Sequence, residues 1–71
     1  MENKFLIDLA VKFGLADKHI SKIADVLRQL GYGDLEEKAS QRAATYLCSQ
    51  KLYELPIEDA VEEMERKGYK V

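Results

Sequence analysis

Two side chains in the sequence, Cys48 and His19, are of the types that serve as a catalytic nucleophile and its general base. Such a pair works only when the two groups lie within hydrogen-bonding distance, and nothing in their spacing indicates that they meet. Cys48 falls inside a helical pattern, on the flank of an apolar face, which is typical of a small core residue. His19 falls at the edge of another apolar stripe, at the boundary between core and surface. We therefore expect neither residue to be catalytic.

The other groups that could do chemistry also lack a recognisable pattern. One histidine and one cysteine are too few ligands for a zinc site. Gly31 and Gly33 lack the rest of the spacing of a nucleotide-binding loop. Several carboxylates fall mostly on the outward part of a predicted helix, where water would surround them: Glu58, Asp59, Glu62, Glu63 and Glu65. We expect no metal, no cofactor and no enzymatic activity.

The chain is short and weakly acidic. Its 71 residues suffice for one domain, spanning 1–71, and chains of this size keep only about 3–5 kcal/mol of net stability. Residues 1–53 hold eight Lys or Arg and seven Asp or Glu, whereas residues 54–71 hold three and six. Neither part is a basic patch of the kind that binds nucleic acid phosphates. The acidic final part would suit a partner protein with a basic surface.

The first residues superficially resemble a secretory signal, because one lysine precedes a short apolar stretch. Asp8 and Lys12 interrupt that stretch, and no cleavage site of small residues follows, so we expect no signal peptide. No apolar run approaches the roughly 18 residues that a membrane span needs. A single thiol excludes an intramolecular disulfide and indicates a reducing compartment. We expect a cytoplasmic protein without membrane contact.

The hydrophobic periodicity predicts an all-α fold, a compact bundle or orthogonal array of four short helices. Gly14 and Gly31 mark two helix ends, Tyr32 folds back on the second, and Pro56 fits the first turn of the last helix. The predicted helices span residues 2–13, 18–30, 34–51 and 56–67.

The helix expected over 34–51 is the longest and should lie at the centre. Asp34 is its expected N-cap, and Glu37 stands where the partner in a capping box belongs. Its expected inward face consists of Leu35, Ala39, Ala43, Tyr46, Leu47 and Tyr53, extended by Ala44 and Cys48.

The first helix carries apolar residues over more than half of its circumference. A helix of this kind is either enclosed by other helices of its own chain or meets a second chain. Both alternatives stay open from the sequence. Tyrosines are favoured at interfaces, and the predicted partner-binding residues are Phe5, Leu6, Val11, Phe13, Tyr53 and Tyr69.

DNA binding is the alternative function. The second helix, a three-residue corner with glycines, and the third helix match the outline of a helix-turn-helix motif. The third helix carries a polar strip with side chains that read base edges: Lys38, Gln41, Arg42, Thr45 and Ser49. Asp34, Glu36 and Glu37 oppose this interpretation, because they would bring negative charge to the groove where the helix enters.

Taken together, these features favour a small, non-catalytic helical protein that works by binding another protein. Its size and composition are typical of regulatory proteins, inhibitors and adaptors, including phage-encoded ones. The surplus of apolar residues on the first helix predicts self-association, as a homodimer or larger homo-oligomer. Nucleic acid is the less favoured partner.

Overall fold

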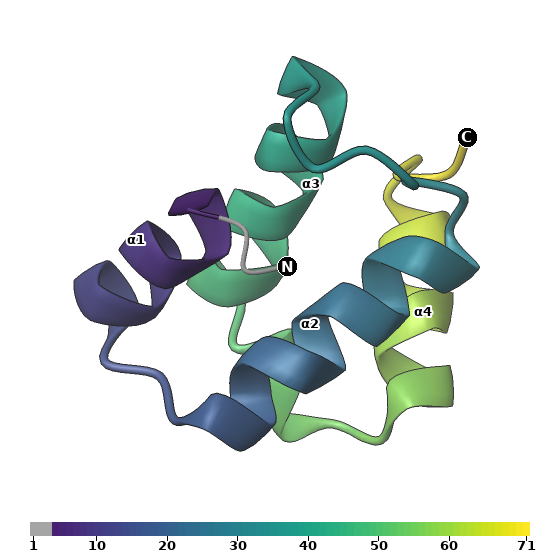
Figure 1. Ribbon diagram of the computed structural model, residues 1–71. Coiled ribbons are helices and arrows are strands. Elements are labelled where there is room, and N and C mark those ends of the chain that lie inside the picture. The colour runs from purple at the N-terminus through teal and green to yellow at the C-terminus, as the bar shows by residue number, and fades with distance from the viewer. Residues whose placement is uncertain (1–3) are drawn as a thin grey trace.

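The computed structural model describes residues 4–71 and confirms the all-α prediction: within these residues there are four α-helices, one short 3-10 helix and no strand (Figure 1). The helices are α1 Lys4–Phe13, α2 Asp17–Gln29, α3 Lys38–Ser49 and α4 Ile57–Arg66, and the 3-10 helix η1 Leu52–Glu54 lies between α3 and α4. The start expected for the first helix, at residue 2, lies outside the described residues.

The end of α2 has the geometry expected from its glycine. Gly31 has a φ of 96°, which glycine adopts without a steric penalty. The N–H of Tyr32 donates to the carbonyl of Leu27 at 2.9 Å, which makes this a Schellman motif. The same type of bond closes α1, from Leu15 to Ala10 at 2.8 Å, and α4, from Tyr69 to Met64 at 2.9 Å.

The start of α3 differs from the prediction, because the helix begins at Lys38 and not at Asp34. The Asp34 side chain accepts a hydrogen bond from the N–H of Glu36 at 2.9 Å, and its carbonyl accepts one from Glu37 at 3.3 Å. Aspartate thus closes a local turn, an alternative to helix capping that this residue often takes. The expected capping box is absent, and the connection between α2 and α3 runs over residues 30–37.

The inward face of α3 also differs in one position. Ala39, expected to be buried, is exposed, and Ser40 is only 2 % exposed. The reason is that neighbours on both sides enclose α3, so its buried arc follows residues 40, 43, 44, 47 and 48. Ala43 and Ala44 are fully buried there, and their small side chains allow the neighbouring helices to come close.

The core lies between α2, α3 and α4, with α1 added on one side (Figure 1). Helices α2 and α3 each pack on all the other helices, whereas α1 and α4 make no contact with each other. Among residues 4–71, no helix has the length and apolar content required to cross a membrane. The most deeply buried large side chains are Ile23, Val26, Leu27, Leu30, Leu47, Cys48 and Met64.

Candidate functional site

The predicted partner-binding residues divide into buried and exposed sets. Leu6 and Tyr53 belong to the core, with 7 % and 8 % of their surfaces exposed, so the expectation that they lie on a contact surface is wrong. Val11 is 79 % exposed, and Phe5, Phe13 and Tyr69 are half-buried. The division on α1 follows its helical period, because Leu6 and Leu9 face the core while Ile7 and Val11 face outward.

Ile7 and Val11 stand one turn apart on α1 and together form an exposed apolar strip, which we call the α1 ridge. Ile7 is 41 % exposed. Val11 is one of the predicted partner-binding residues and Ile7 is not. The apolar surplus of the helix indicates a contact surface at both positions. Charged side chains flank the ridge along the same helix: Lys4, Asp8 and Lys12.

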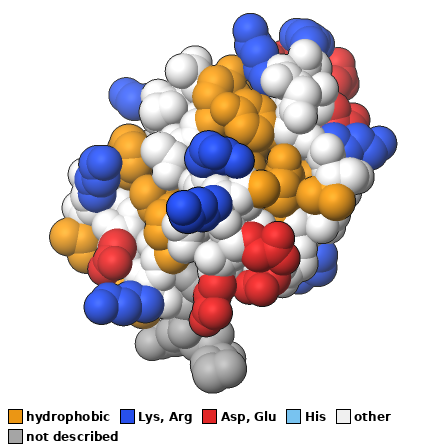
Figure 2. All heavy atoms as spheres, turned by 90° about the horizontal axis from the view of Figure 1, so that it is seen from above, with side chains coloured by type: hydrophobic (Ala, Val, Ile, Leu, Met, Phe, Trp, Pro, Cys, Tyr) orange, Lys and Arg blue, Asp and Glu red, His pale blue; other side chains and the backbone are white. Residues whose placement is uncertain are grey.

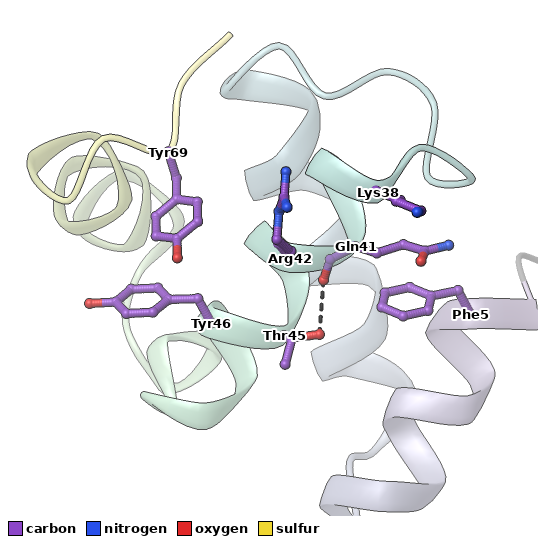
Figure 3. Close-up of a pocket in the computed structure, with 7 residues that line it drawn as sticks. All are labelled: Phe5, Lys38, Gln41, Arg42, Thr45, Tyr46 and Tyr69. Carbon is purple, nitrogen blue, oxygen red and sulfur yellow. Dashed lines mark hydrogen bonds between the residues drawn. The ribbon is translucent and has the colours of Figure 1, made fainter.

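A second candidate surface is an open groove of about 640 Å³ along α3, mostly apolar in its lining. Figure 3 shows α3 as its floor, with Phe5 of α1 on one side and Tyr69 on the other. On the face seen from above, basic side chains lie directly beside hydrophobic ones (Figure 2). The residues that line the groove are Phe5, Lys38, Gln41, Arg42, Thr45, Tyr46 and Tyr69.

Two aromatic residues form one wall of the groove. Tyr46 and Tyr69 stack with their ring centroids 4.8 Å apart and their planes 25° from parallel. Such pairs contribute about 0.5–1.5 kcal/mol beyond the burial of their surface. The C-terminal segment is held beside this wall, because the N–H of Val71 donates to the carbonyl of Leu30 at 3.0 Å.

Four of the five residues predicted for DNA contact line the groove, and Ser49 does not. The polar groups of three of the five already bond to their own backbone. Thr45 Oγ1 donates to the carbonyl of Gln41 at 2.8 Å, and Ser49 Oγ donates to that of Tyr46 at 3.0 Å. Gln41 Nε2 donates to the carbonyl of Leu35 at 3.4 Å. These donors are therefore less available to a ligand.

The two basic residues of the groove, Lys38 and Arg42, form no ion pair with any residue of 4–71, and the same holds for every other lysine of these residues except Lys70. The placement of Lys38 and Arg42 is unfavourable for the helix itself. Lys38 begins α3, where the helix dipole disfavours a cation by about 0.3–1 kcal/mol. Arg42 follows one turn later, and such like-charged pairs destabilise a helix by about 0.2–0.5 kcal/mol.

His19 takes part in the fold. Its Nδ1 accepts a hydrogen bond from the N–H of Ala16 at 3.4 Å, and the centroid of its ring lies 4.7 Å from the ring centroid of Tyr53. Nearby, Lys22 Nζ donates to the carbonyl of Leu55 at 3.0 Å. His19 therefore links the start of α2 to the segment that follows α3. Among residues 4–71, no group of three or more His, Cys, Asp or Glu is arranged to hold a metal ion.

Cys48 is a free thiol, 1 % exposed, in the core. Burial raises the pKa of this thiol from 9.0 to about 11, because the thiolate would lose its hydration. The thiolate is the reactive form, so we expect Cys48 to react with iodoacetamide only as fast as the chain opens. Mass spectrometry of alkylated samples checks this. Reaction in buffer as fast as in concentrated urea would contradict the burial of Cys48.

The raised pKa of Cys48 also predicts a pH dependence of stability. The thiol ionises at a lower pH in the unfolded chain than in the folded chain. Its contribution to the free energy of unfolding is therefore complete below pH 9.0 and is lost as the pH rises toward about 11. Urea denaturation at pH 8 and pH 11 measures the loss, with Cys48→Ala as the matched variant because it differs from the unchanged protein only in this thiol. An equal alkaline loss in the two proteins would contradict the prediction.

The groove joins residues that the sequence had assigned to two different functions. Phe5 and Tyr69 came from the protein-binding hypothesis, and Lys38 and Arg42 from the DNA-binding one. The only signal for it in the sequence is the spacing of Lys38, Arg42 and Tyr46, which places these residues on one face of a helix. Comparisons of the chain with protein-family models, curated proteins and solved structures found no match.

Proposed function

We propose that this chain is a small, non-catalytic helical protein that works by binding other proteins, as a regulator, inhibitor or adaptor, and that it associates with itself through α1. The observation that carries the proposal is the α1 ridge, where Val11 is 79 % exposed and Ile7 41 %. Apolar surface of this kind is stabilised when a second chain covers it. As part of the same proposal we place the protein in the cytoplasm, where a free thiol such as Cys48 stays reduced.

The charges beside the α1 ridge support a second copy of the chain as the occupant. Asp8 lies one turn from both Lys4 and Lys12 on the exposed side of α1. Two copies of α1 packed antiparallel across a twofold axis would bring Asp8 of each copy toward a lysine of the other. The ridge is small compared with the roughly 800 Å² per partner of a stable interface, so the association should be weak and dependent on concentration.

Replacing Val11 by Asp should abolish this self-association, because it places a charge in the middle of the apolar contact. Sedimentation equilibrium from about 10 µM to about 1 mM should show a mass that rises with concentration for the unchanged protein and stays monomeric for Val11→Asp. Val71→Asp is the matched control, since Val71 is 78 % exposed elsewhere on the surface. A constant monomer mass for the unchanged protein would refute the self-association.

The acidic side of α4 supports a basic protein partner less strongly. Glu62 and Glu63 pair with Arg66, and Glu65 pairs with Lys70. These pairs reduce the negative charge that α4 offers, so the expected basic partner stays a prediction without further support.

DNA binding by α3 stays the second candidate, since Lys38 and Arg42 form no ion pair within residues 4–71. It ranks below protein binding for a geometric reason. The connection before α3 runs over residues 30–37, much longer than the tight corner of a helix-turn-helix. Glu36 and Glu37 also lie directly before the helix and would repel phosphates.

A further inference from the structure

We infer that the groove along α3 binds an acidic amphipathic helix of another protein. An apolar side chain of that helix enters between Phe5 and the pair Tyr46–Tyr69, and its carboxylates bind Lys38 and Arg42. The inference rests on the proposed function, because it assigns a partner to a protein that binds proteins. It uses a surface other than the α1 ridge, so the two can fail separately.

The shape of the groove favours a helix over a small molecule. Its volume of about 640 Å³ lies within the usual range for ligands, but the groove is shallow and open to solvent. A small ligand would therefore keep much of its surface in water. An amphipathic helix laid along such a groove inserts apolar side chains at helical spacing and keeps its other side hydrated.

The walls provide a site for an apolar anchor. Phe5 comes from α1, and Tyr69 follows α4, so two different parts of the fold position the two sides (Figure 3). Tyr69 is braced by its stacking on Tyr46, with the centroids 4.8 Å apart. Rigid aromatic side chains around a buried anchor are typical of the residues that dominate binding energy at protein interfaces.

The charges select an acidic partner. Among residues 4–71, no carboxylate lines the groove, and the two cations that do line it have no ion-pair partner. Lys38 and Arg42 stand one turn apart, which matches carboxylates one turn apart on a bound helix. A neighbouring depression beyond Phe5 contains two carboxylates, Asp8 and Glu36, and one cation, Lys4. The acidic part of the partner should therefore lie on the Lys38–Arg42 side, where only cations line the groove.

A single-stranded nucleic acid also pairs basic and aromatic side chains, but the groove fits it less well. Nucleic acid binding requires a track of positive charge along the phosphates. Within residues 4–71 two cations line the groove, and the depression beside it holds the carboxylates of Asp8 and Glu36 together with a single further cation, Lys4. The rings of Tyr46 and Tyr69 stack on each other, which occupies faces that bases would need.

Fluorescence anisotropy with defined probes tests the inference. The first probe is a labelled amphipathic peptide of about 18 residues, with Leu and Phe at helical spacing and Glu beside them. The second carries Gln in place of each Glu, and the third is a single-stranded oligonucleotide. The proteins are the unchanged chain, the double variant Lys38→Glu with Arg42→Glu, and a control with Lys18→Glu and Lys67→Glu. The control changes the net charge equally at exposed lysines outside the groove.

We expect the acidic peptide to bind the unchanged chain and the control equally, and the Lys38→Glu, Arg42→Glu variant at least about tenfold more weakly. The Gln peptide should lose about the same factor with the unchanged chain. Equal binding of the acidic peptide to both variants, no binding at all, or binding of the oligonucleotide alone would overturn the inference. Such a result together with self-association that depends on Val11 would leave the proposed function intact.

Discussion

Leu27→Ala is expected to leave a large part of the chain unfolded at 25 °C. Leu27 is fully buried on α2, which, like α3, packs on every other helix. Truncating a buried leucine to alanine removes about 2–5 kcal/mol, from the lost burial and from the cavity. A chain of this size has only about 3–5 kcal/mol in total. Urea denaturation followed by circular dichroism at 222 nm measures the change.

Leu15→Ala is the matched control for this experiment, since Leu15 is half-buried in the link between α1 and α2. The same side-chain truncation there should remove clearly less stability, because part of the leucine is already in water. A loss below about 1 kcal/mol for Leu27→Ala would contradict the central place of α2 in the core.

Gly31→Ala is expected to have the second-largest effect, about 2 kcal/mol, from two sources. The φ of 96° is strained for any residue with a Cβ, at a cost of about 1–2 kcal/mol. A Cβ at Gly31 would also lie 3.0 Å from Cβ of Val71. Relieving that contact moves the segment whose Val71 N–H donates to Leu30, and it loosens the groove wall beside Tyr69.

Substitutions at two other glycines distinguish the backbone strain from the contact with Val71. Gly14 has a φ of 66° with open space around it, so Gly14→Ala should show the backbone strain alone. Gly33 has neither a positive φ nor a neighbour within 4 Å of the added Cβ, so Gly33→Ala should be neutral or slightly stabilising. We expect the urea midpoint to be highest for Gly33→Ala, lower for Gly14→Ala and lowest for Gly31→Ala. Equal midpoints for the last two would show that the contact with Val71 contributes nothing.

The helix ends at Gly14 and Gly31 were predictable because glycine is favoured wherever a helix closes with positive φ. The start of α3 was not predictable, because Asp34 has two local options. Its side chain either caps a helix or closes a turn, and the choice depends on how the connection after α2 packs. The burial of Ser40 in place of the expected Ala39 has a related cause. Helices on both sides of α3 determine which of its residues are buried.

Tyr53 takes the inward position that the hydrophobic pattern indicates, but it does so through a turn that this pattern does not reveal. Lys51 adopts a left-handed φ of 56°, which ends α3 and begins η1. This reversal directs Tyr53 inward, against the ring of His19, and removes it from the predicted contact surface. Left-handed lysine is rare enough that a sequence pattern does not anticipate it.

The groove was beyond prediction for a different reason. Phe5, the strip on α3 and Tyr69 come from three distant segments, and only the packing of α1 and of the C-terminal segment around α3 brings them together. Periodicity shows which side of a helix is apolar, but it does not show which other helix lies beside it. The exposure of Val11 agrees with one of the two alternatives that the apolar surplus of α1 left open, and its contact with a second chain stays a prediction.

A dilution series followed by ¹H–¹⁵N NMR tests the central claim, that another copy of the chain covers the exposed side of α1. Between about 1 mM and about 20 µM, the amide signals of Lys4–Phe13 should shift progressively, most strongly at Ile7 and Val11. Signals of Ile57–Arg66 should stay constant, because α4 makes no contact with α1. Signals of α1 that do not move over this range would contradict the claim.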